Sequence, residues 1–369
     1  MSKTTHAPRT GYRNSLLVTV SAIALLGSGG TTAIAADAGR PLIWIDLGWQ
    51  FERDGGGQQA FAPGFVDAFV SNGFSSPSKI EKALPWSYGA DGEISYQPEN
   101  SDWIFSASVR YGRTHGSKSF HQQTTALAGT RHINLGPIHF TATNQLENYE
   151  EAKATNTETH EILDFQAGRD MGLGLFGGTS MLSAGIRFAQ IKFGSHSKIN
   201  GHPDLYLPTN LKYAAHVHVY YATNTQERAF NGLGPTLSWK SSAPLVGNRS
   251  DGEIALDWGI NAGILFGKQK ATGHHQTKTN YYRTAIPLFG GKYHGYHHTT
   301  VPHNRSRPVI VPNLGGFAGL SLKWTNAKIS LGYRADVFFN AIDDGMDARK
   351  TENRGFYGPF ASISVGLGD

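Results

Sequence analysis

Between residues 254 and 266 the chain alternates between apolar side chains and side chains that are mostly polar or small. The apolar series is Ile254, Leu256, Trp258, Ile260, Ala262, Ile264 and Phe266, and the intervening series is Ala255, Asp257, Gly259, Asn261, Gly263 and Leu265. A period of two directs successive side chains to opposite faces of a β-strand. The segment therefore predicts a strand with one apolar face and one largely polar face.

The same alternation recurs along the chain. Nine further segments carry it: 43–51, 88–96, 103–111, 163–171, 182–188, 229–239, 314–324, 329–339 and 357–367. Ten strands is an even number, as bacterial outer-membrane barrels have. The stretch 211–221 also alternates, so it either extends a strand or adds a hairpin. Counts of eight or twelve strands therefore stay open.

A soluble β-sandwich would alternate too, and three features favour a membrane barrel over it. The segments are about 9 to 13 residues long, which suits a tilted membrane strand. Aromatic residues such as Trp103 and Trp239 at one end, and Phe51 and Tyr88 at the other, suggest two interfacial girdles. Long connections (53–85, 114–159, 194–227, 268–312, 341–354) alternate with tight ones (98–101, 173–178, 325–326) and an intermediate one (241–251). The fold class predicted is an all-β transmembrane antiparallel β-barrel with short periplasmic turns and long extracellular loops.

The N-terminal region reads as an export signal. Lys3, Arg9 and Arg13 precede an apolar run at 15–26 and the small-residue site Ala33-Ile34-Ala35. This order is typical of a signal peptide, and the apolar run is too short for an uncleaved transmembrane anchor. We therefore expect residues 1–35 to be cleaved and 36–369 to form a single barrel domain.

Charge and composition narrow the function. The formal net charge is +5, and the three leader residues account for +3, so the mature chain is near +2 and offers no support for nucleic-acid binding. No other segment approaches 18 consecutive apolar residues, which excludes spanning helices. The chain has no Cys, so disulfides and thiolate metal sites are excluded. No cofactor is expected.

Several short motifs resemble a known family. They are Ser95-Tyr96-Gln97-Pro98, Asp102-Trp103-Ile104-Phe105, Val109-Arg110-Tyr111-Gly112-Arg113, Asp164-Phe165-Gln166-Ala167-Gly168-Arg169-Asp170, Phe230-Asn231-Gly232-Leu233-Gly234-Pro235 and Gly332-Tyr333-Arg334-Ala335-Asp336. The chain resembles the Legionella major-outer-membrane-protein-like family of pore-forming β-barrels. The resemblance implies the outer membrane of a Gram-negative bacterium and a pore or surface-contact role, without catalytic residues. The expected partners are outer-membrane lipid and lipopolysaccharide, the barrel insertion machinery and small solutes or ions. Without Cys, a homo-oligomer would have to be non-covalent.

The polar face of the strands would form the lumen. Its candidate lining residues are Asp46, Gln50, Asp91, Glu93, Arg110, Asp164, Gln166, Asp170, Arg187, Asp257, Asn261, Lys323, Arg334 and Asp336, with Glu52 and Lys328 in the same register. Charges of both signs would set a transverse field that selects solutes in a hydrophilic channel. An ion-pair network that fills a narrow interior explains them equally well.

Histidines gather in the predicted loops. Six in the 268–312 loop are candidate metal ligands: His274, His275, His294, His297, His298 and His303. Neutral imidazoles bind zinc, copper or nickel, although solvated loop residues of no special role would look the same. Asp343 and Asp344 could imitate the carboxylates of an outer-membrane hydrolase, but nothing fixes their geometry. We expect a porin-like channel and no enzyme. The alternative is a surface adhesion or metal-binding barrel whose His-rich loops are the functional part.

Overall fold

The computed structural model separates residues 1–38 from 39–369, and all the residues described below belong to the second unit. They are 43–56, 86–99, 101–135, 138–172, 178–202, 205–207, 214–284, 292–299, 303–345 and 348–367. The expected signal peptide, residues 1–35, lies outside this part of the chain.

The described residues form β-strands joined by turns. The strands are β1 (Ile43–Gly56), β2 (Ser87–Tyr96), β3 (Trp103–Leu135), β4 (Ile138–Asp170), β5 (Thr179–His202), β6 (Leu205–Leu207), β7 (Ala214–Asn248), β8 (Gly252–Thr284), β9 (Lys292–Thr299), β10 (His303–Lys323), β11 (Ala327–Asp343) and β12 (Thr351–Leu367). Among the described residues, no helix is long and apolar enough to cross a membrane.

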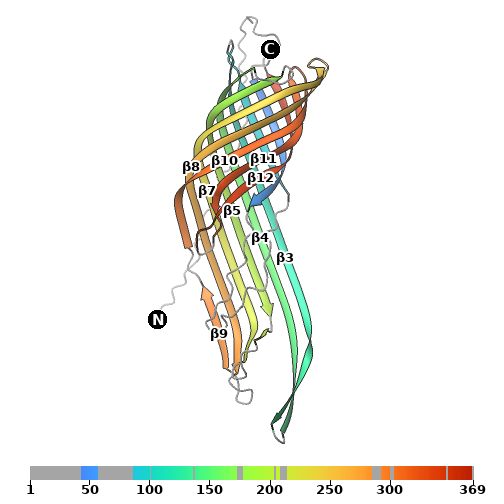
Figure 1. Cartoon of the computed structure of the whole chain (residues 1–369), viewed down its shortest axis with the longest axis vertical. Helices are drawn as coiled ribbons and strands as arrows, with labels where there is room; N and C mark the ends of the chain where they lie inside the picture. Colours follow the sequence, from blue (N-terminus) through green and yellow to red (C-terminus); the bar gives the residue numbers. More distant parts are fainter. Residues whose placement is uncertain are drawn as a thin grey trace, which may run out of the picture. The chain divides into compact units, whose positions relative to one another are not determined.

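Ten of the described strands close into an antiparallel barrel (Figure 1). The order round the ring is β1, β2, β3, β4, β5, β7, β8, β10, β11 and β12, and β12 pairs with β1 to close it. The short strands β6 and β9 pair with β7 and β8 outside the ring. The predicted fold class and ten-strand count are confirmed.

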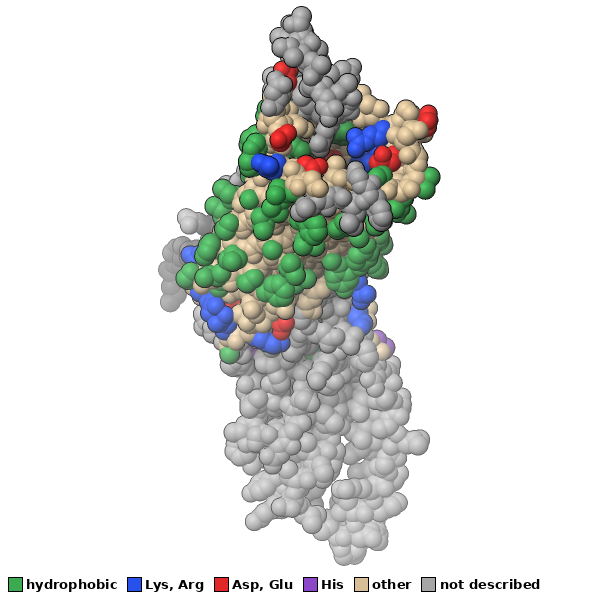
Figure 2. Space-filling model, turned by 45° about the horizontal axis from the view of Figure 1, so that its top comes forward, with side chains coloured by type: hydrophobic (Ala, Val, Ile, Leu, Met, Phe, Trp, Pro, Cys, Tyr) green, Lys and Arg blue, Asp and Glu red, His purple; other side chains and the backbone are tan. Residues whose placement is uncertain are grey.

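The outward face of the barrel is apolar. Ile260 in β8, Leu237 in β7 and Leu331 in β11 each expose more than half of their surface, and together with similar residues they form the green band in Figure 2. In water such a surface would be strongly unfavourable, whereas the hydrocarbon core of a bilayer covers it. We call this surface the apolar belt.

The strands are longer than the apolar pattern predicts. Residues 114–135 and 138–159, from the segment expected as a loop, continue β3 and β4 as a paired ribbon, and 241–248 continue β7. The described part of the stretch 211–221, which is 214–221, extends a strand, since it forms the start of β7. In 114–119 the side chains are polar or small on both faces, so no hydrophobic period marks the strand there.

Tight turns connect the strands at the opposite end, as predicted. Asn248 closes the β7–β8 turn: its Oδ1 accepts hydrogen bonds from the backbone amides of Ser250 at 3.0 Å and Asp251 at 2.9 Å. The Asp170 carboxylate does the same at the β4–β5 turn, where it accepts from the amides of Gly172 and Ser180. Gly172 adopts a φ of +66°, a left-handed conformation that favours glycine.

Candidate functional site

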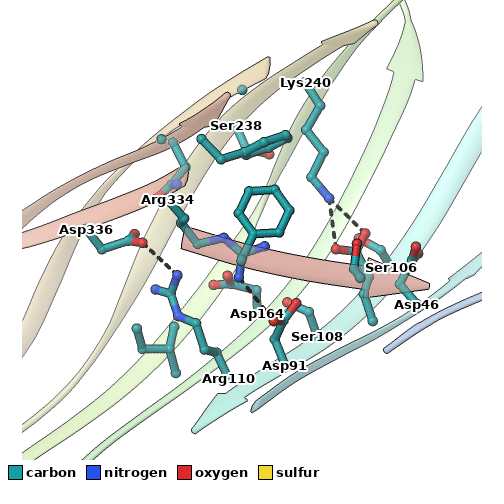
Figure 3. A pocket seen from close by; sticks show the side chains of 18 of the residues that line it. Asp46, Asp91, Ser106, Ser108, Arg110, Asp164, Ser238, Lys240, Arg334 and Asp336 are labelled. Atoms are coloured by element: carbon teal, nitrogen blue, oxygen red, sulfur yellow. Dashed lines mark hydrogen bonds and ion pairs between the residues drawn. The ribbon is translucent and has the colours of Figure 1, made fainter. Parts of the chain in front are cut away.

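The inward face of the barrel encloses a cavity of about 220 Å³ near the end with the tight turns (Figure 3). All ten strands of the barrel contribute residues to the cavity wall, because every second side chain of a strand points inward. Sequence-predicted residues on the cavity wall are Asp46, Asp91, Glu93, Arg110, Asp164, Gln166, Arg187, Asp257, Asn261, Arg334 and Asp336, with Lys328 beside them. The wall therefore carries many charged side chains, with both signs present, among serine, glycine and a few apolar residues.

Two ion pairs cross the lumen between strands that are far apart in the ring. Lys240 on β7 donates to both carboxylate oxygens of Glu93 on β2, at 2.8 and 2.9 Å. Arg110 on β3 donates to Asp336 on β11 at 2.6 Å. Each pair joins strands that do not neighbour each other, so the two pairs brace the lumen and narrow it.

Arg187 collects several acceptors in the middle of the barrel. Its Nε and Nη2 donate to the two oxygens of Asp164 at 2.7 Å each, a bidentate geometry. Its Nη1 donates to the side-chain oxygens of Asn261, at 2.7 Å, and of Asn313. The arginine is buried, so this full set of acceptors compensates for the lost hydration.

Asp257 and Arg334 show two other ways of holding a charge. Asp257 is contacted by two ammonium groups, Lys323 at 2.8 Å and Lys328 at 2.9 Å. Arg334 lies 3.4 Å from Asp91, and its guanidinium lies 5.0 Å from the centre of the Phe360 ring. A cation above an aromatic face gains from the ring quadrupole.

Asp46 differs from the other acids of the wall. It faces Glu93 directly across the β1–β2 pair, and like charges in this position repel. Its carboxylate accepts a hydrogen bond from the Ser364 hydroxyl. Within the described part of the chain no lysine or arginine forms an ion pair with Asp46. Lys240 thus faces two neighbouring carboxylates and pairs with one.

Side-chain exposure falls from the turn end of the cavity toward its depth. The exposed fraction is 35% for Lys240 and 23% for Glu93, but 1% for Asp336. Glu93 lies three residues before the end of β2, and Lys240 pairs with Met181, two residues after the start of β5, so both lie toward the tight turns. The cavity is therefore more accessible from this end, which the topology of short turns makes periplasmic.

An apolar cluster lies inside the barrel beyond the cavity. It contains Ile162, Ala189, Ile191, Phe230, Leu265, Val311, Phe338, Ala341, Ile342 and Phe356. All of them are buried, and the Phe338 and Phe356 rings meet edge to face at 6.1 Å between centroids. The interior is therefore not uniformly polar, and this layer narrows the lumen.

Buried charges lie next to the apolar cluster. Arg228 pairs with Asp344 at 2.8 Å, and Arg354 lies 3.6 Å from Glu158 on a distant strand. Arg354 also lies over the Phe193 ring at 4.9 Å. Arg228 and Asp344 lie beyond the apolar belt. Burial lowers the pKa of Arg228 to about 10 and raises the pKa of Asp344, although the two charges attract each other. Both shifts favour the neutral form of the group.

Glu52 and His160 make a further contact in the same region. His160 Nε2 lies 3.5 Å from Glu52 Oε1, with both side chains almost fully buried. The imidazole stacks on Phe356 of the apolar cluster, with 3.9 Å between the ring centroids. The contact joins β1 to β4 across the interior, and through Phe356 it borders the apolar cluster.

Three predicted lumen residues lie off the cavity wall. Gln50 is buried and its amide contacts the Arg334 carbonyl oxygen at 3.5 Å, and Lys323 reaches the wall only through Asp257. Asp170 faces the β4–β5 turn, where its carboxylate binds backbone amides instead of lining the cavity. The reason is that Asp170 is the last residue of its strand.

The predicted metal ligands are spread over three strands. His274 and His275 lie in β8, while His294, His297 and His298 lie in β9, which pairs with β8. His303 begins β10 opposite Gly273. Over the residues that the structure describes, no three His, Asp or Glu side chains gather in a geometry that could hold a metal ion.

Sequence reasoning missed Lys240 and the interior aromatic residues. Lys240 lies one residue beyond the predicted strand 229–239, because the apolar pattern stops at Trp239, although the inward series Ser238, Lys240, Ser242 continues the period of two. Phe317 and Phe360, with 6.1 Å between ring centroids, also contribute to the cavity wall. The period of two places both residues on the inward face, but the sequence gives no reason for an apolar side chain on a largely polar face.

Comparison with known proteins gives a family. Residues 85–366 match the family model described as the Legionella pneumophila major outer membrane protein precursor. No curated protein matches the chain. Among solved structures, the outer membrane protease OmpT from Escherichia coli aligns at 10% identity and a TM-score of 0.37, covering 88% of this chain and 96% of that one. The P. putida toluene transporter TodX aligns at 9% identity and a TM-score of 0.18, covering 90% and 91%. At these scores neither likeness bears on function.

Proposed function

The chain belongs to the Legionella pneumophila major outer membrane protein family, and we propose that its barrel is a narrow channel for small hydrophilic solutes or ions. The observation that carries this proposal is the charged interior cavity. Its wall mixes acids and bases, and it is most accessible at the periplasmic end. A barrel that served only as an anchor would gain little from such a cavity, since desolvating charges is costly.

In this proposal the apolar cluster is the constriction of the channel. A hydrophobic ring can close a pore to water and ions without any moving plug, because water leaves a narrow apolar passage. The rings of Phe338 and Phe356 meet within this layer. Conductance should therefore be small and should depend on the size of these two side chains.

The apolar cluster also favours a second candidate. A barrel whose interior is sealed would serve as an anchor for the long strands outside the membrane, as surface adhesion or metal binding would require. The ion pairs that cross the lumen support sealing as well. The two candidates differ in one measurable property, which is whether the folded protein conducts.

We also infer that the protein is not an enzyme. Asp343 and Asp344 were the carboxylates considered for a hydrolase. Asp343 binds the guanidinium of Arg305 at 3.0 Å, and Asp344 binds that of Arg228 at 2.8 Å. Carboxylates engaged in this way are poorly suited to activate water. This supports a structural role for both.

Conductance in planar bilayers tests the channel. Wild-type protein should give small, stable steps, and Phe338→Ala should enlarge them because the smaller side chain widens the constriction. Ile310→Ala, on the outward face, is the matched control and should leave conductance unchanged. Removal of a buried Phe costs about 3–5 kcal/mol, so heat-modifiable gel mobility must first show that the variant is folded. Folded wild type and Phe338→Ala that both insert without conducting would favour the anchor.

A further inference from the structure

A basic patch lies on the outward face of the barrel, just beyond the apolar belt on the extracellular side. It consists of Lys192 on β5 with Lys268 and Lys270 on β8, all exposed. Lys192 and Lys270 both pair with Ala229 of the intervening strand β7, from opposite sides. With strands about 4.8 Å apart, the two lysines lie roughly 10 Å from each other, so the three ammonium groups can reach one anionic ligand.

Among the residues that the structure describes, the lysines of the basic patch have no counter-ion in contact with them. Within the described part of the chain, no carboxylate forms an ion pair with Lys192, Lys268 or Lys270. Two outward acids lie next to the patch in the register: Glu227 on β7, which pairs with Gly194 and Thr272, and Glu161 on β4, which pairs with Gln190. Each lies two residues away from the position opposite a patch lysine, so three lysines face two carboxylates. The patch therefore keeps a net positive charge directed to the outside of the barrel.

The apolar belt begins immediately below these lysines. Phe266 on β8 is 57% exposed and lies two residues from Lys268, about 7 Å along the strand. Leu233 and Ile310 pair with Phe266 from either side and are equally exposed. In Figure 2, Lys and Arg side chains border the lower edge of the green band, the edge nearer the long strands. A cationic group above an exposed apolar surface suits a lipid whose charge lies at the membrane surface.

We propose that the basic patch and the belt below it bind lipopolysaccharide of the outer leaflet through its phosphate groups. The acyl chains would cover Phe266, Leu233 and Ile310 while the phosphates accept hydrogen bonds from the three lysines. The patch lies at the extracellular end, where the outer leaflet has its phosphorylated glycolipid. Free phosphate would use the charges but not the belt. The proposal depends on the membrane location and not on whether the lumen conducts.

The experiment measures binding of bisphosphorylated lipid A to the full chain in nanodiscs of neutral phospholipid. The triple variant Lys192→Gln, Lys268→Gln and Lys270→Gln should bind about tenfold or more weakly than wild type. The matched control is Lys153→Gln, Lys198→Gln and Lys278→Gln, which removes the same charge from exposed positions farther out on strands β4, β5 and β8. This control should bind as wild type does.

Two further ligands, dephosphorylated lipid A and inorganic phosphate, show whether the patch binds a phosphorylated lipid or free phosphate. Dephosphorylated lipid A should bind weakly to wild type, and its affinity for the triple variant should be the same as for wild type. Inorganic phosphate should not compete at millimolar concentration, because it lacks acyl chains. Undiminished binding by the patch variant, equal loss in both triple variants, or efficient competition by inorganic phosphate would each overturn the proposal. All three proteins must show the same heat-modifiable mobility, and exposed Lys→Gln changes should preserve it.

Discussion

Two glycines make room for the buried contact between Glu52 and His160. A Cβ added at Gly112 would lie 2.2 Å from both Glu52 Oε2 and His160 Cε1, and one added at Gly89 would lie 2.8 Å from the Glu52 carboxyl carbon. Atoms at such distances clash, so neither position accepts alanine without displacing the pair. At this level of the barrel the small residues on β2 and β3 are what allow two polar groups to meet in the interior.

Gly112→Ala should therefore destabilise the barrel. The expected loss is about 1–3 kcal/mol, because Glu52 or His160 must leave a closely packed site. Urea unfolding in lipid vesicles, followed by tryptophan fluorescence, measures it. Gly92→Ala is the control, since its Cβ would meet no atom closer than 3.8 Å. Equal stability of the two variants would contradict the packing described for this contact.

At the scale of elements, one carboxylate makes several of the hydrogen bonds in the β11–β12 connection. Asp343 accepts backbone hydrogen bonds from Gly345 at 3.2 Å and Lys350 at 3.1 Å, and its other oxygen binds Arg305 on β10. Burial alone would raise the pKa of Asp343, but the Arg305 hydrogen bond and the two amides hold it below its ordinary value of 3.8. The ionised form is therefore the one that stabilises this connection.

A lowered pKa in the folded state gives a definite pH dependence. The stabilisation by Asp343 is fully present above pH 3.8 and is lost as pH falls through the lower folded value. Hydrogen exchange of the amides of Gly345 and Lys350 should be slower in wild type than in Asp343→Asn at pH 5. That difference should shrink steadily below pH 3.8. Because the raised pKa of Asp344 has the opposite linkage, comparison with the single variant is needed to isolate Asp343. A difference independent of pH would refute this assignment.

The limits of sequence prediction also belong to the scale of elements. The alternation of apolar and polar residues predicted every barrel strand, because the side chains that face lipid must be apolar, as Ile260 and Leu331 are. Outside the membrane this demand ends, so β3 and β4 continue past residue 113 without any apolar period to mark them. Lys240 lies just past such a boundary, at the end of the predicted strand 229–239, and was therefore not predicted as a lumen residue. Polar side chains can occupy both faces of a strand in water, and the pattern then carries no information.

The interior could be predicted only in part, for a different reason. Register gives the direction of a side chain, and the structure places the predicted inward residues Asp164 and Arg187 opposite each other on the cavity wall. Partners across the lumen depend on shear and on side-chain length, which no local pattern encodes. The pairing of Lys240 with Glu93 is such a case. Inward apolar residues such as Phe338 likewise became an interpretable layer only when their neighbours were known.

For the whole molecule, the apolar belt fixes the barrel in the membrane. Ile260, 56% exposed, lies on the outward face in the membrane-spanning part of β8. Ile260→Arg should cost about 2–4 kcal/mol, the range for an arginine at the midplane of a membrane barrel. Urea unfolding in lipid vesicles measures this cost. Ile260→Leu is the control and should cost less than about 1.5 kcal/mol. An equally mild effect of arginine would mean that this face does not meet lipid.

Ion selectivity is the property in which the whole lumen acts together. Lys240 at the periplasmic end faces two carboxylates, Asp46 and Glu93, and forms its ion pair with Glu93. In a narrow passage little water screens such charges, so each one acts strongly on a passing ion. Lys240→Gln would leave two unpaired carboxylates at the entrance. Glu93→Gln would leave an ammonium group whose nearest carboxylate is Asp46.

The two variants should therefore shift selectivity in opposite directions. Under a KCl gradient, the reversal potential of Lys240→Gln should move toward cation preference and that of Glu93→Gln toward anion preference. Both should conduct somewhat more than wild type, because each breaks an ion pair that crosses the lumen. Lys153→Gln, on the exposed strand extension, removes one positive charge at a distance and should leave the reversal potential unchanged. Shifts of the same sign in both lumen variants would mean that ions do not pass between Lys240 and Glu93, and that the charged cavity lies off the conduction path.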